Sequence, residues 1–141
     1  MKLLFLCTGN SCRSQMAEGW ARQLLPGDEI LSAGLEAHGL NPLAIQVMSE
    51  SGIDIRAQES TLVSDELIAH SDVVITVCGH ADEHCPLVPA EKQKLHWPLP
   101  DPAKLAGTEE EILDGFRQVR DEIKQHIVGL KNAFQADNVK V

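Results

Sequence analysis

The chain has 141 residues, a formal net charge of −9 and a hydrophobic content of 43%. This length suits one hydrophobic core, so we expect residues 1–141 to form a single domain. The negative charge argues against nucleic acid or an anionic membrane as a partner, and no apolar run reaches the roughly 18 residues of a membrane span, so we expect a cytoplasmic protein.

Strand-like and helix-like patterns alternate along the chain. Four apolar segments fit buried strands, at residues 3–6, 29–34, 72–77 and 94–97. Between the first two, one helical face carries Met16, Ala17, Trp20 and Leu24. A further helix is predicted after Asn41, with Pro42 at its first position and Gly52 past its end. This alternation predicts an α/β fold in which helices cover both faces of a parallel sheet.

The last helix has the clearest pattern in the sequence. Thr108 and Glu111 match a capping box at its start. Apolar residues then recur every three or four positions as one buried stripe, which comprises Ile112, Phe116, Val119, Ile123, Ile127, Leu130 and Phe134. The polar residues after Phe134 are expected to form a loose tail.

The segment after the first strand has the residue types of an anion site. The apolar run 3–6 ends at Cys7, and a loop then leads into a helix that starts near Arg13. Ligands of parallel α/β sheets bind at the carboxyl ends of strands, where such a loop offers backbone N–H groups and the positive end of a helix. Gly9 is expected to allow unusual backbone angles. The predicted oxyanion site comprises Thr8, Gly9, Asn10, Ser11, Cys12, Arg13 and Ser14.

The chemistry of this loop depends on Cys7 and Arg13. Arg13 offers a planar fork for two oxygens of a tetrahedral oxyanion, and the same positive field favours the reactive thiolate of Cys7. Ser14 can donate a hydrogen bond to the sulfur. A lone cysteine is more often a small buried hydrophobe, but a cysteine and an arginine six positions apart between a strand and a helix predict nucleophilic attack on a bound oxyanion.

Two further cysteines favour redox chemistry. Cys78 ends the third strand, at the same sheet edge as Cys7, and Cys85 follows the helix-compatible segment 79–84. Seven positions along a helix rise about 10 Å, whereas the Cα atoms of a disulfide lie within about 7 Å of each other. Cys78 and Cys85 can therefore bond only if the segment unwinds. Cys12 is expected to be a packing thiol without a step of its own.

Several stretches together resemble one family. They are "CTGNSCRSQMAEGW" (7–20), "SAGLEAHGLNP" (32–42), "SDVVITVCGHADEHCP" (71–86) and "HWPLPDPAK" (96–104). In this order they resemble the thioredoxin-coupled arsenate reductase branch of the low-molecular-weight tyrosine phosphatase fold. The resemblance extends over nearly the whole chain and implies a four-stranded parallel sheet.

The resemblance also implies roles for single residues. Cys7 is the implied nucleophile, Arg13 the oxyanion clamp and Asp101 the general acid; Asp101 also lies in a proline-fixed turn after the last strand. In the implied relay, Cys7 attacks arsenate, Cys78 attacks Cys7 to release arsenite, and Cys85 attacks Cys78. Thioredoxin then reduces the Cys78–Cys85 disulfide. We expect a monomer that confers arsenic resistance and binds no cofactor or metal.

Two other functions fit parts of the pattern. A tyrosine phosphatase would use Cys7, Arg13 and Asp101 with water alone. Phosphatases of this fold that act on aryl phosphates line the pocket with aromatic side chains, whereas this chain has no tyrosine and only two tryptophans, Trp20 and Trp97. The other alternative is a metal-binding module, whose candidate ligands are Cys78, His80, His84 and Cys85. Their spacing matches no standard zinc motif and leaves Cys7 and Arg13 unexplained.

One position departs from the family pattern. Some members bind potassium near the active loop through Asn, Glu, Ser and Asp side chains. Asn10, Glu18 and Ser32 match the first three, but Thr61 stands at the acidic fourth position. Because one carboxylate ligand is missing, the potassium ion is not carried over to this chain.

Overall fold

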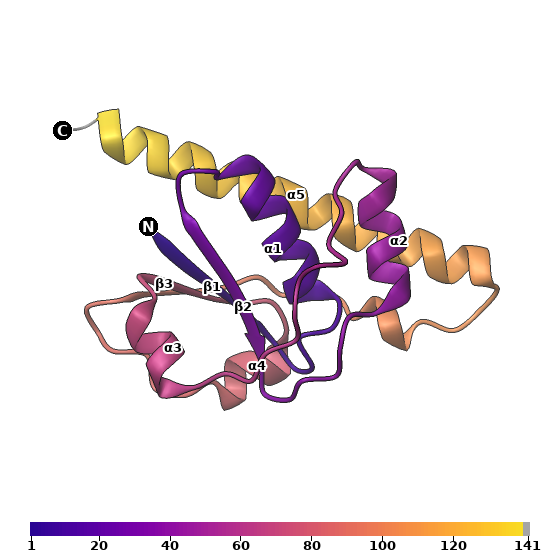
Figure 1. The fold of residues 1–141 in the computed structure, drawn as a ribbon, viewed down its shortest axis with the longest axis horizontal. Helices are drawn as coiled ribbons and strands as arrows, with labels where there is room; N and C mark the ends of the chain where they lie inside the picture. The colour runs from indigo at the N-terminus through magenta and orange to yellow at the C-terminus, as the bar shows by residue number, and fades with distance from the viewer. Residues whose placement is uncertain (140–141) are drawn as a thin grey trace.

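A parallel four-stranded sheet forms the centre of the protein. The structure, a computed structural model, describes residues 1–139 (Figure 1). The strands are β1 (Lys2–Cys7), β2 (Glu29–Gly34), β3 (Val73–Thr76) and β4 (Gln93–His96). They lie in the order β2-β1-β3-β4, and every neighbouring pair is parallel. The α/β fold and all four strands predicted from the sequence are confirmed, with ends that shift by at most one residue.

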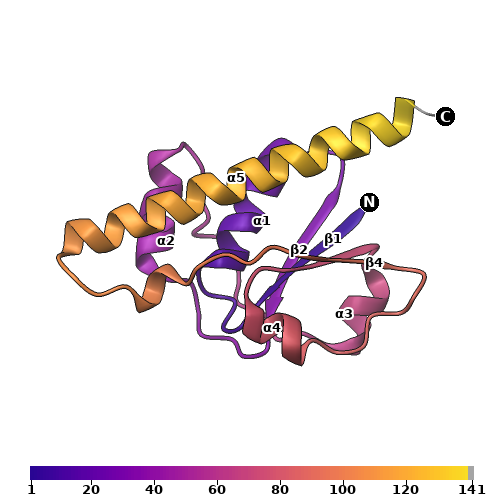
Figure 2. The ribbon, with the colours of Figure 1, turned by 180° about the vertical axis from the view of Figure 1, so that it is seen from behind.

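Helices cover both faces of the sheet (Figures 1 and 2). One face carries α1 (Arg13–Leu24), α2 (Pro42–Glu50) and the long α5 (Glu109–Val139), which runs across the other two. The other face carries α3 (Asp65–His70) and α4 (Gly79–His84), and a 3-10 turn, η1 (Pro102–Lys104), precedes α5. The sequence did not predict α3, because a six-residue helix with only Ile68 buried has no periodic pattern.

The predicted helix boundaries follow local chemistry. The Asn41 side chain accepts a hydrogen bond from the Leu43 N–H at 2.9 Å and so caps α2. Thr108 caps α5 by accepting from the Glu111 N–H at 3.1 Å. The predicted loose tail is wrong in part, because α5 continues to Val139; no glycine or proline follows Phe134 to stop it.

The apolar stripe of α5 closes the core over the sheet. Phe116, Ile123 and Ile127 on α5 are fully buried, and so is Phe5 on β1. Burial on both faces fits the continuous apolar runs of a central parallel strand. The core therefore fixes where β1 ends, and with it the position of Cys7.

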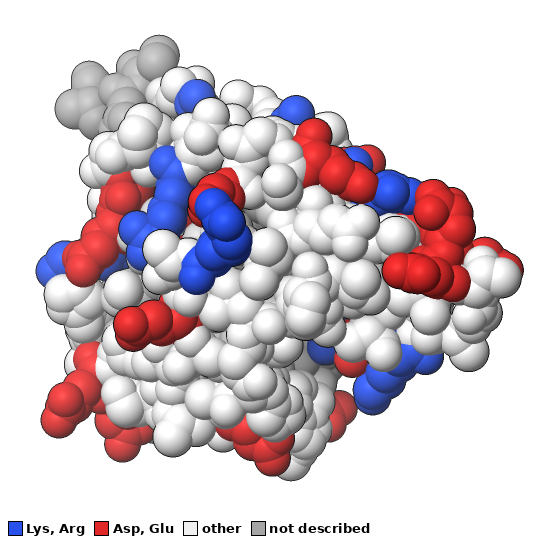
Figure 3. Space-filling view, turned by 45° about the vertical axis from the view of Figure 1, so that its right-hand side comes forward, with Lys and Arg blue, Asp and Glu red and all other residues white. Residues whose placement is uncertain are grey.

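Charge on the surface is mixed. On the face shown in Figure 3, the basic side chains lie singly or beside acidic ones instead of forming one continuous basic patch. Within residues 1–139, no helix is both long and apolar enough to cross a membrane.

Candidate active site

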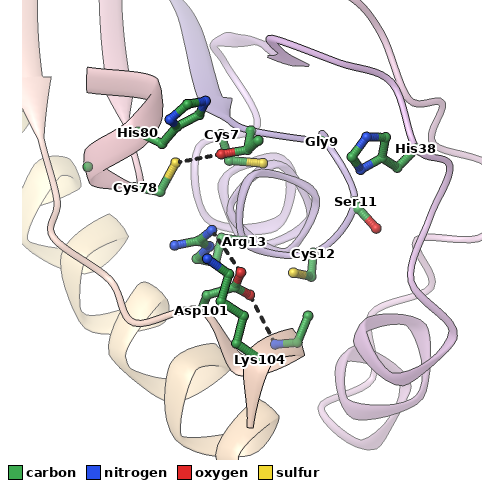
Figure 4. A pocket seen from close by; sticks show the side chains of 13 residues that line it. Cys7, Gly9, Ser11, Cys12, Arg13, His38, Cys78, His80, Asp101 and Lys104 are labelled. Carbon is green, nitrogen blue, oxygen red and sulfur yellow. Dashed lines mark hydrogen bonds and ion pairs between the residues drawn. The ribbon is translucent and has the colours of Figure 1, made fainter. Parts of the chain in front are cut away.

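A pocket opens at the carboxyl ends of β1 and β3 (Figure 4). The strand register explains the place, because Leu6 pairs with Thr76, so that Cys7 and Cys78 leave the sheet at the same edge. The pocket is lined by most of the predicted site residues: Cys7, Thr8, Gly9, Ser11, Cys12, Arg13, Cys78 and Asp101. Asn10 and Ser14 do not line the pocket; both are fully buried. Cys85 also lies outside it, at the end of α4.

The loop after β1 presents the N–H side of its peptides to the pocket. The Thr8 carbonyl accepts from the Glu36 N–H at 2.8 Å, and the Gly9 carbonyl accepts from the His38 N–H at 2.9 Å. In a trans peptide the N–H points opposite to the carbonyl, so the following N–H groups face inward. Asn10 reaches this bend with a φ of 47°, a left-handed conformation that asparagine tolerates.

The reason for Gly9 differs from the one expected. Its φ is not in the left-handed region; Asn10 alone of the loop residues adopts it. A β-carbon at Gly9 would collide with the His38 ring, which packs against the loop. The constraint at Gly34, at the end of β2, is stricter, because a β-carbon there would lie 2.6 Å from the backbone nitrogen of Asn10, whereas the half-exposed His38 side chain could turn away from Gly9. Both glycines serve close packing around the loop.

The loop is also braced by Gln15 on α1 and by residues far away in the sequence. Ser60 donates from its hydroxyl to the carbonyls of Gly9 and Asn10, at 3.2 and 3.1 Å. The Thr61 N–H donates to Asn10 Oδ1 at 2.7 Å, and Gln15 Nε2 donates to the Asn10 carbonyl at 3.1 Å. These bonds hold the loop in its bent form.

A buried chain of hydrogen bonds runs from Glu18 to Cys7. The donor and acceptor of each bond follow from the residue types. Glu18 Oε1 accepts from the Ser32 hydroxyl at 2.6 Å, so Ser32 Oγ is free to accept from Asn10 Nδ2 at 3.0 Å. Asn10 Nδ2 also donates to Ser14 Oγ, at 2.7 Å. The hydroxyl hydrogen of Ser14 is thereby left for Cys7 Sγ, 2.8 Å away. A hydroxyl that donates to the sulfur stabilises its thiolate form.

Asn10, Glu18, Ser32 and Thr61, at the potassium positions of the family that the sequence resembles, do not fit that ion here. Glu18 Oε2 already accepts from Arg22 Nε at 2.9 Å, and Arg22 also donates to the Ile30 carbonyl. Thr61 offers its backbone N–H to Asn10 where the family pattern has a carboxylate. A guanidinium therefore lies beside the carboxylate that would otherwise bind the cation.

We expect potassium to leave turnover unchanged for this reason. The measurement compares kcat/KM for arsenate in potassium chloride with kcat/KM for arsenate in tetramethylammonium chloride at equal ionic strength. The matched variant Arg22→Met removes the guanidinium and should lower kcat/KM, since Glu18 loses the partner that orients it. Activation of the unaltered protein by potassium would contradict this assignment.

Arg13 has the donor arrangement of an oxyanion clamp. It is 8% exposed, and one terminal nitrogen donates to the Leu99 carbonyl at 3.1 Å. Its other terminal nitrogen lies 3.5 Å from Asp101 Oδ2. Within the described residues, Arg13 Nε is buried and has no hydrogen-bond partner. Because an unpaired buried donor is costly, this N–H is available for an anion in the pocket.

Asp101 is fixed by the turn that it begins. Its Oδ1 accepts from the Ala103 N–H at 3.0 Å and so caps η1. Its Oδ2 faces Arg13 and the pocket (Figure 4). The carboxyl group therefore has one oxygen for structure and one for a bound molecule.

Cys78 and Cys85 lie at opposite ends of α4. Cys78 is 3% exposed, and its sulfur accepts from the Ala81 N–H at 3.3 Å as the N-cap of the helix. Thr8 Oγ1 lies 3.4 Å from the same sulfur. Cys85 is partly buried, and this burial raises the pKa of its thiol, so Cys85 is protonated in the folded helix at neutral pH.

Cys12 lies inside the loop as a protonated thiol. Burial, and then the nearby charges of Cys7 and Asp101, raise the pKa of Cys12 to about 12. Its side chain makes no capping bond at the start of α1. A thiol with this pKa is a poor nucleophile at neutral pH.

Cys12→Ser should accordingly keep most of the turnover, and peptide mapping after limited iodoacetamide should find Cys7 alkylated well before Cys12. The control is Cys7→Ser treated in the same way. A loss of activity in Cys12→Ser as large as that in Cys7→Ser would show that Cys12 takes part in the chemistry.

Three polar pocket residues were not predicted as site residues from the sequence. His38, His80 and Lys104 line the pocket with the predicted residues. Lys104 follows Asp101 within the same proline-fixed turn, so it could have been predicted as a pocket residue from the sequence. His38 reaches the pocket only because the segment after β2 runs along the loop, which no local pattern reveals. The four-ligand metal module considered as an alternative is not assembled among the described residues, because the Cys78 sulfur points inward, away from the exposed His80 and His84.

Comparison with known proteins adds family relationships. The model for the low molecular weight phosphotyrosine protein phosphatase family matches residues 2–140. The arsenate reductase of Halalkalibacterium halodurans is 54% identical over 127 residues, which are 89% of this chain and 91% of that protein. An arsenate reductase of Staphylococcus aureus strain Newman is 48% identical over 131 residues, or 92% and 95% of the two chains.

Solved structures give the same fold. An arsenate reductase in the phosphate binding state matches with a TM-score of 0.77 at 37% identity, covering 94% of this chain and 97% of that chain. The tyrosine phosphatase Wzb from Escherichia coli K30, in complex with sulphate, matches with a TM-score of 0.80 at 23% identity and the same coverage of 94% and 97%.

Proposed function

Because the chain belongs to the low molecular weight phosphotyrosine protein phosphatase family, we propose that it reduces arsenate to arsenite through a relay of three thiols. One observation carries the proposal: Cys7 and Cys78 line the same pocket, and Cys85 lies at the far end of the helix that Cys78 caps. A phosphatase needs one thiol and water, whereas this reduction needs two electrons, which two thiols supply by forming a disulfide. The similar proteins named arsenate reductases support the same substrate.

In the first step the Cys7 thiolate attacks arsenic, and an S–As bond forms. One As–O bond breaks, and Asp101 Oδ2 supplies the proton with which a hydroxyl of arsenate leaves as water. The unpaired Nε of Arg13 and the loop N–H groups bind the remaining oxygens. A similar arsenate reductase is known in a phosphate binding state, which supports binding of a tetrahedral anion by a protein of this fold.

In the second step the Cys78 thiolate attacks Cys7 Sγ. The S–As bond breaks, its electron pair stays on arsenic, and arsenic leaves as As(III) while a Cys7–Cys78 disulfide forms. Thr8 next to both residues supports this step, since its hydroxyl lies within 3.4 Å of Cys78 Sγ. Cys85 then attacks Cys78 and releases Cys7 as a thiolate. Unwinding of α4 brings Cys85 within reach and removes the burial that keeps it protonated.

A dithiol partner has to reduce the Cys78–Cys85 disulfide, and we propose thioredoxin. The unwound segment carries the disulfide to the surface, where such a partner can attack it. We further propose a cytoplasmic location, where a reducing environment keeps cysteines as thiols. In this proposal the protein acts as a monomer without a bound cofactor and confers arsenic resistance.

The direct test measures arsenite. Purified protein is mixed with arsenate, thioredoxin, thioredoxin reductase and NADPH, and we expect one arsenite for each NADPH consumed. Omitting thioredoxin should leave at most one arsenite per chain. A parallel assay with glutathione and glutaredoxin tests the reductant. Absence of arsenite in both assays would overturn the proposed activity, and arsenite in the second alone would overturn the choice of thioredoxin.

A phosphatase remains the second candidate, because Cys7, Arg13 and Asp101 lie in one pocket. None of the described residues that line this pocket is Phe or Trp, so an aryl group finds little apolar surface there. We expect slow hydrolysis of p-nitrophenyl phosphate. If this hydrolysis is fast and arsenite formation is absent, the phosphatase function is preferred.

Asp101→Asn tests the proton donor. The amide oxygen can still accept from the Ala103 N–H, so η1 keeps its cap while the transferable proton is lost. The single-turnover rate of arsenite release should fall by about 100-fold, the usual size of general acid catalysis. A rate equal to that of the unaltered protein would show that Asp101 serves the turn alone.

A further inference from the structure

Two histidines lie one turn apart on the helix between the relay cysteines. His80 and His84 are both exposed on α4, and the centroids of their rings are 4.5 Å apart. Side chains at positions i and i+4 share one helix face. Two imidazoles at this spacing on a helix are the arrangement with which HxxxH motifs ligate zinc.

The surroundings define the kind of ion. Among the residues that the structure describes, no group of three or more His, Cys, Asp or Glu is placed to hold a metal. Cys78 is turned away, toward Ala81 and Thr8. A bound ion would therefore have two imidazole ligands and water. Imidazole suits nickel, copper and zinc, whereas magnesium and calcium require oxygen ligands.

We infer that His80 and His84 bind one divalent transition-metal ion, and that the bound ion locks α4 in its helical form. The two rings lie close together only while the intervening turn is helical, so the ion binds the folded segment and not the unwound one. A ligand at ten times its Kd then lowers the population of the unwound segment by about 11-fold. The ion itself takes no part in the reaction.

The consequence for turnover rests on the proposed function. The Cys78–Cys85 disulfide requires unwinding of α4, so a locked helix stalls the relay after the Cys7–Cys78 disulfide has formed. His80 also lines the pocket, which places the ion at its rim. The metal site itself does not depend on arsenate chemistry and can be tested without it.

The binding test titrates Ni²⁺ into fully reduced protein and follows the heat of binding. The comparison uses His80→Asn, His84→Asn and the matched control His70→Asn, which alters an exposed histidine on α3. We expect one Ni²⁺ per chain, an affinity at least about tenfold lower in either α4 variant, and no change in the control. Equal affinity in all four proteins would place the ion elsewhere on the chain and overturn the site.

The locking test measures amide hydrogen exchange over residues 80–85. At ten times the Kd, Ni²⁺ should slow this exchange by about tenfold in the unaltered protein and leave it unchanged in His84→Asn. Unchanged exchange despite binding would overturn the lock. Formation of the Cys78–Cys85 disulfide under arsenate should slow by the same factor. If no arsenite forms even without metal, the proposed function fails, while the binding and exchange results still decide the site.

Discussion

Cys7→Ser will abolish arsenate reduction and phosphate ester hydrolysis together. A serine hydroxyl at neutral pH carries almost no nucleophilic anion, whereas the cysteine receives a hydrogen bond from Ser14 and lies among inward N–H groups. The loop should keep its shape, because Ser60 and Thr61 brace it through Gly9 and Asn10 and not through the sulfur. We expect no arsenite above the blank over many hours.

Two measurements separate lost chemistry from a lost fold. Thermal unfolding of Cys7→Ser should remain close to that of the unaltered protein, and arsenate or phosphate should still bind in the pocket. Cys12→Ser is the matched control, since it changes another loop sulfur and should remain active. Arsenite formation by Cys7→Ser would overturn the nucleophile and with it the relay.

Cys78→Ser and Cys85→Ser will stop the cycle at different points. Cys85→Ser should release about one arsenite per chain and then stall with a Cys7–Cys78 disulfide, because only the resolving thiol is missing. Cys78→Ser should release almost none, since the remaining thiol in the pocket, that of Cys12, is protonated at neutral pH and is a poor nucleophile. Peptide mapping identifies the disulfide in each variant, and rapid quenching measures the arsenite burst.

The phosphatase reaction provides the control for both variants. It uses Cys7, Arg13 and Asp101, so hydrolysis of p-nitrophenyl phosphate should survive in Cys78→Ser and in Cys85→Ser. Hydrogen exchange in α4 should rise in the unaltered protein after arsenate, because the new disulfide needs the helix to unwind. Sustained arsenate reduction by both serine variants would favour a reaction without the second cysteine pair.

Local patterns were sufficient to predict much of the fold. The strands were visible as apolar runs, α2 from its asparagine cap and proline, and α5 from its threonine cap and apolar stripe. These signals act within a few residues, so they survive in the sequence. By contrast, α3 is short and mostly exposed, and its helical form depends on the cap from Ser64 and on packing of Ile68.

The candidate site shows the same division. Cys7, Arg13 and Asp101 could be selected because each lies in a distinctive local motif. Asn10, Glu18 and Ser32 were matched to potassium ligands, whereas in the structure they bond to one another. Matching residues to the potassium positions could not reveal Arg22, which donates to Glu18. The position of its side chain depends on how α1 packs beside β2.

In the proposed relay, the long-range support of the active loop also determines which thiol moves. Cys7 belongs to a segment tied down at Gly9 and Asn10 by Ser60 and Thr61. Cys78 caps a six-residue helix, and at the loop its sulfur is held by one weak 3.4 Å contact with Thr8. When the sulfurs exchange partners, the nucleophile can stay in register with the oxyanion subsite while its partner departs. Each round of the proposed relay can thus end with an oxyanion loop that is already shaped for the next arsenate. Only α4 has to unwind and form again.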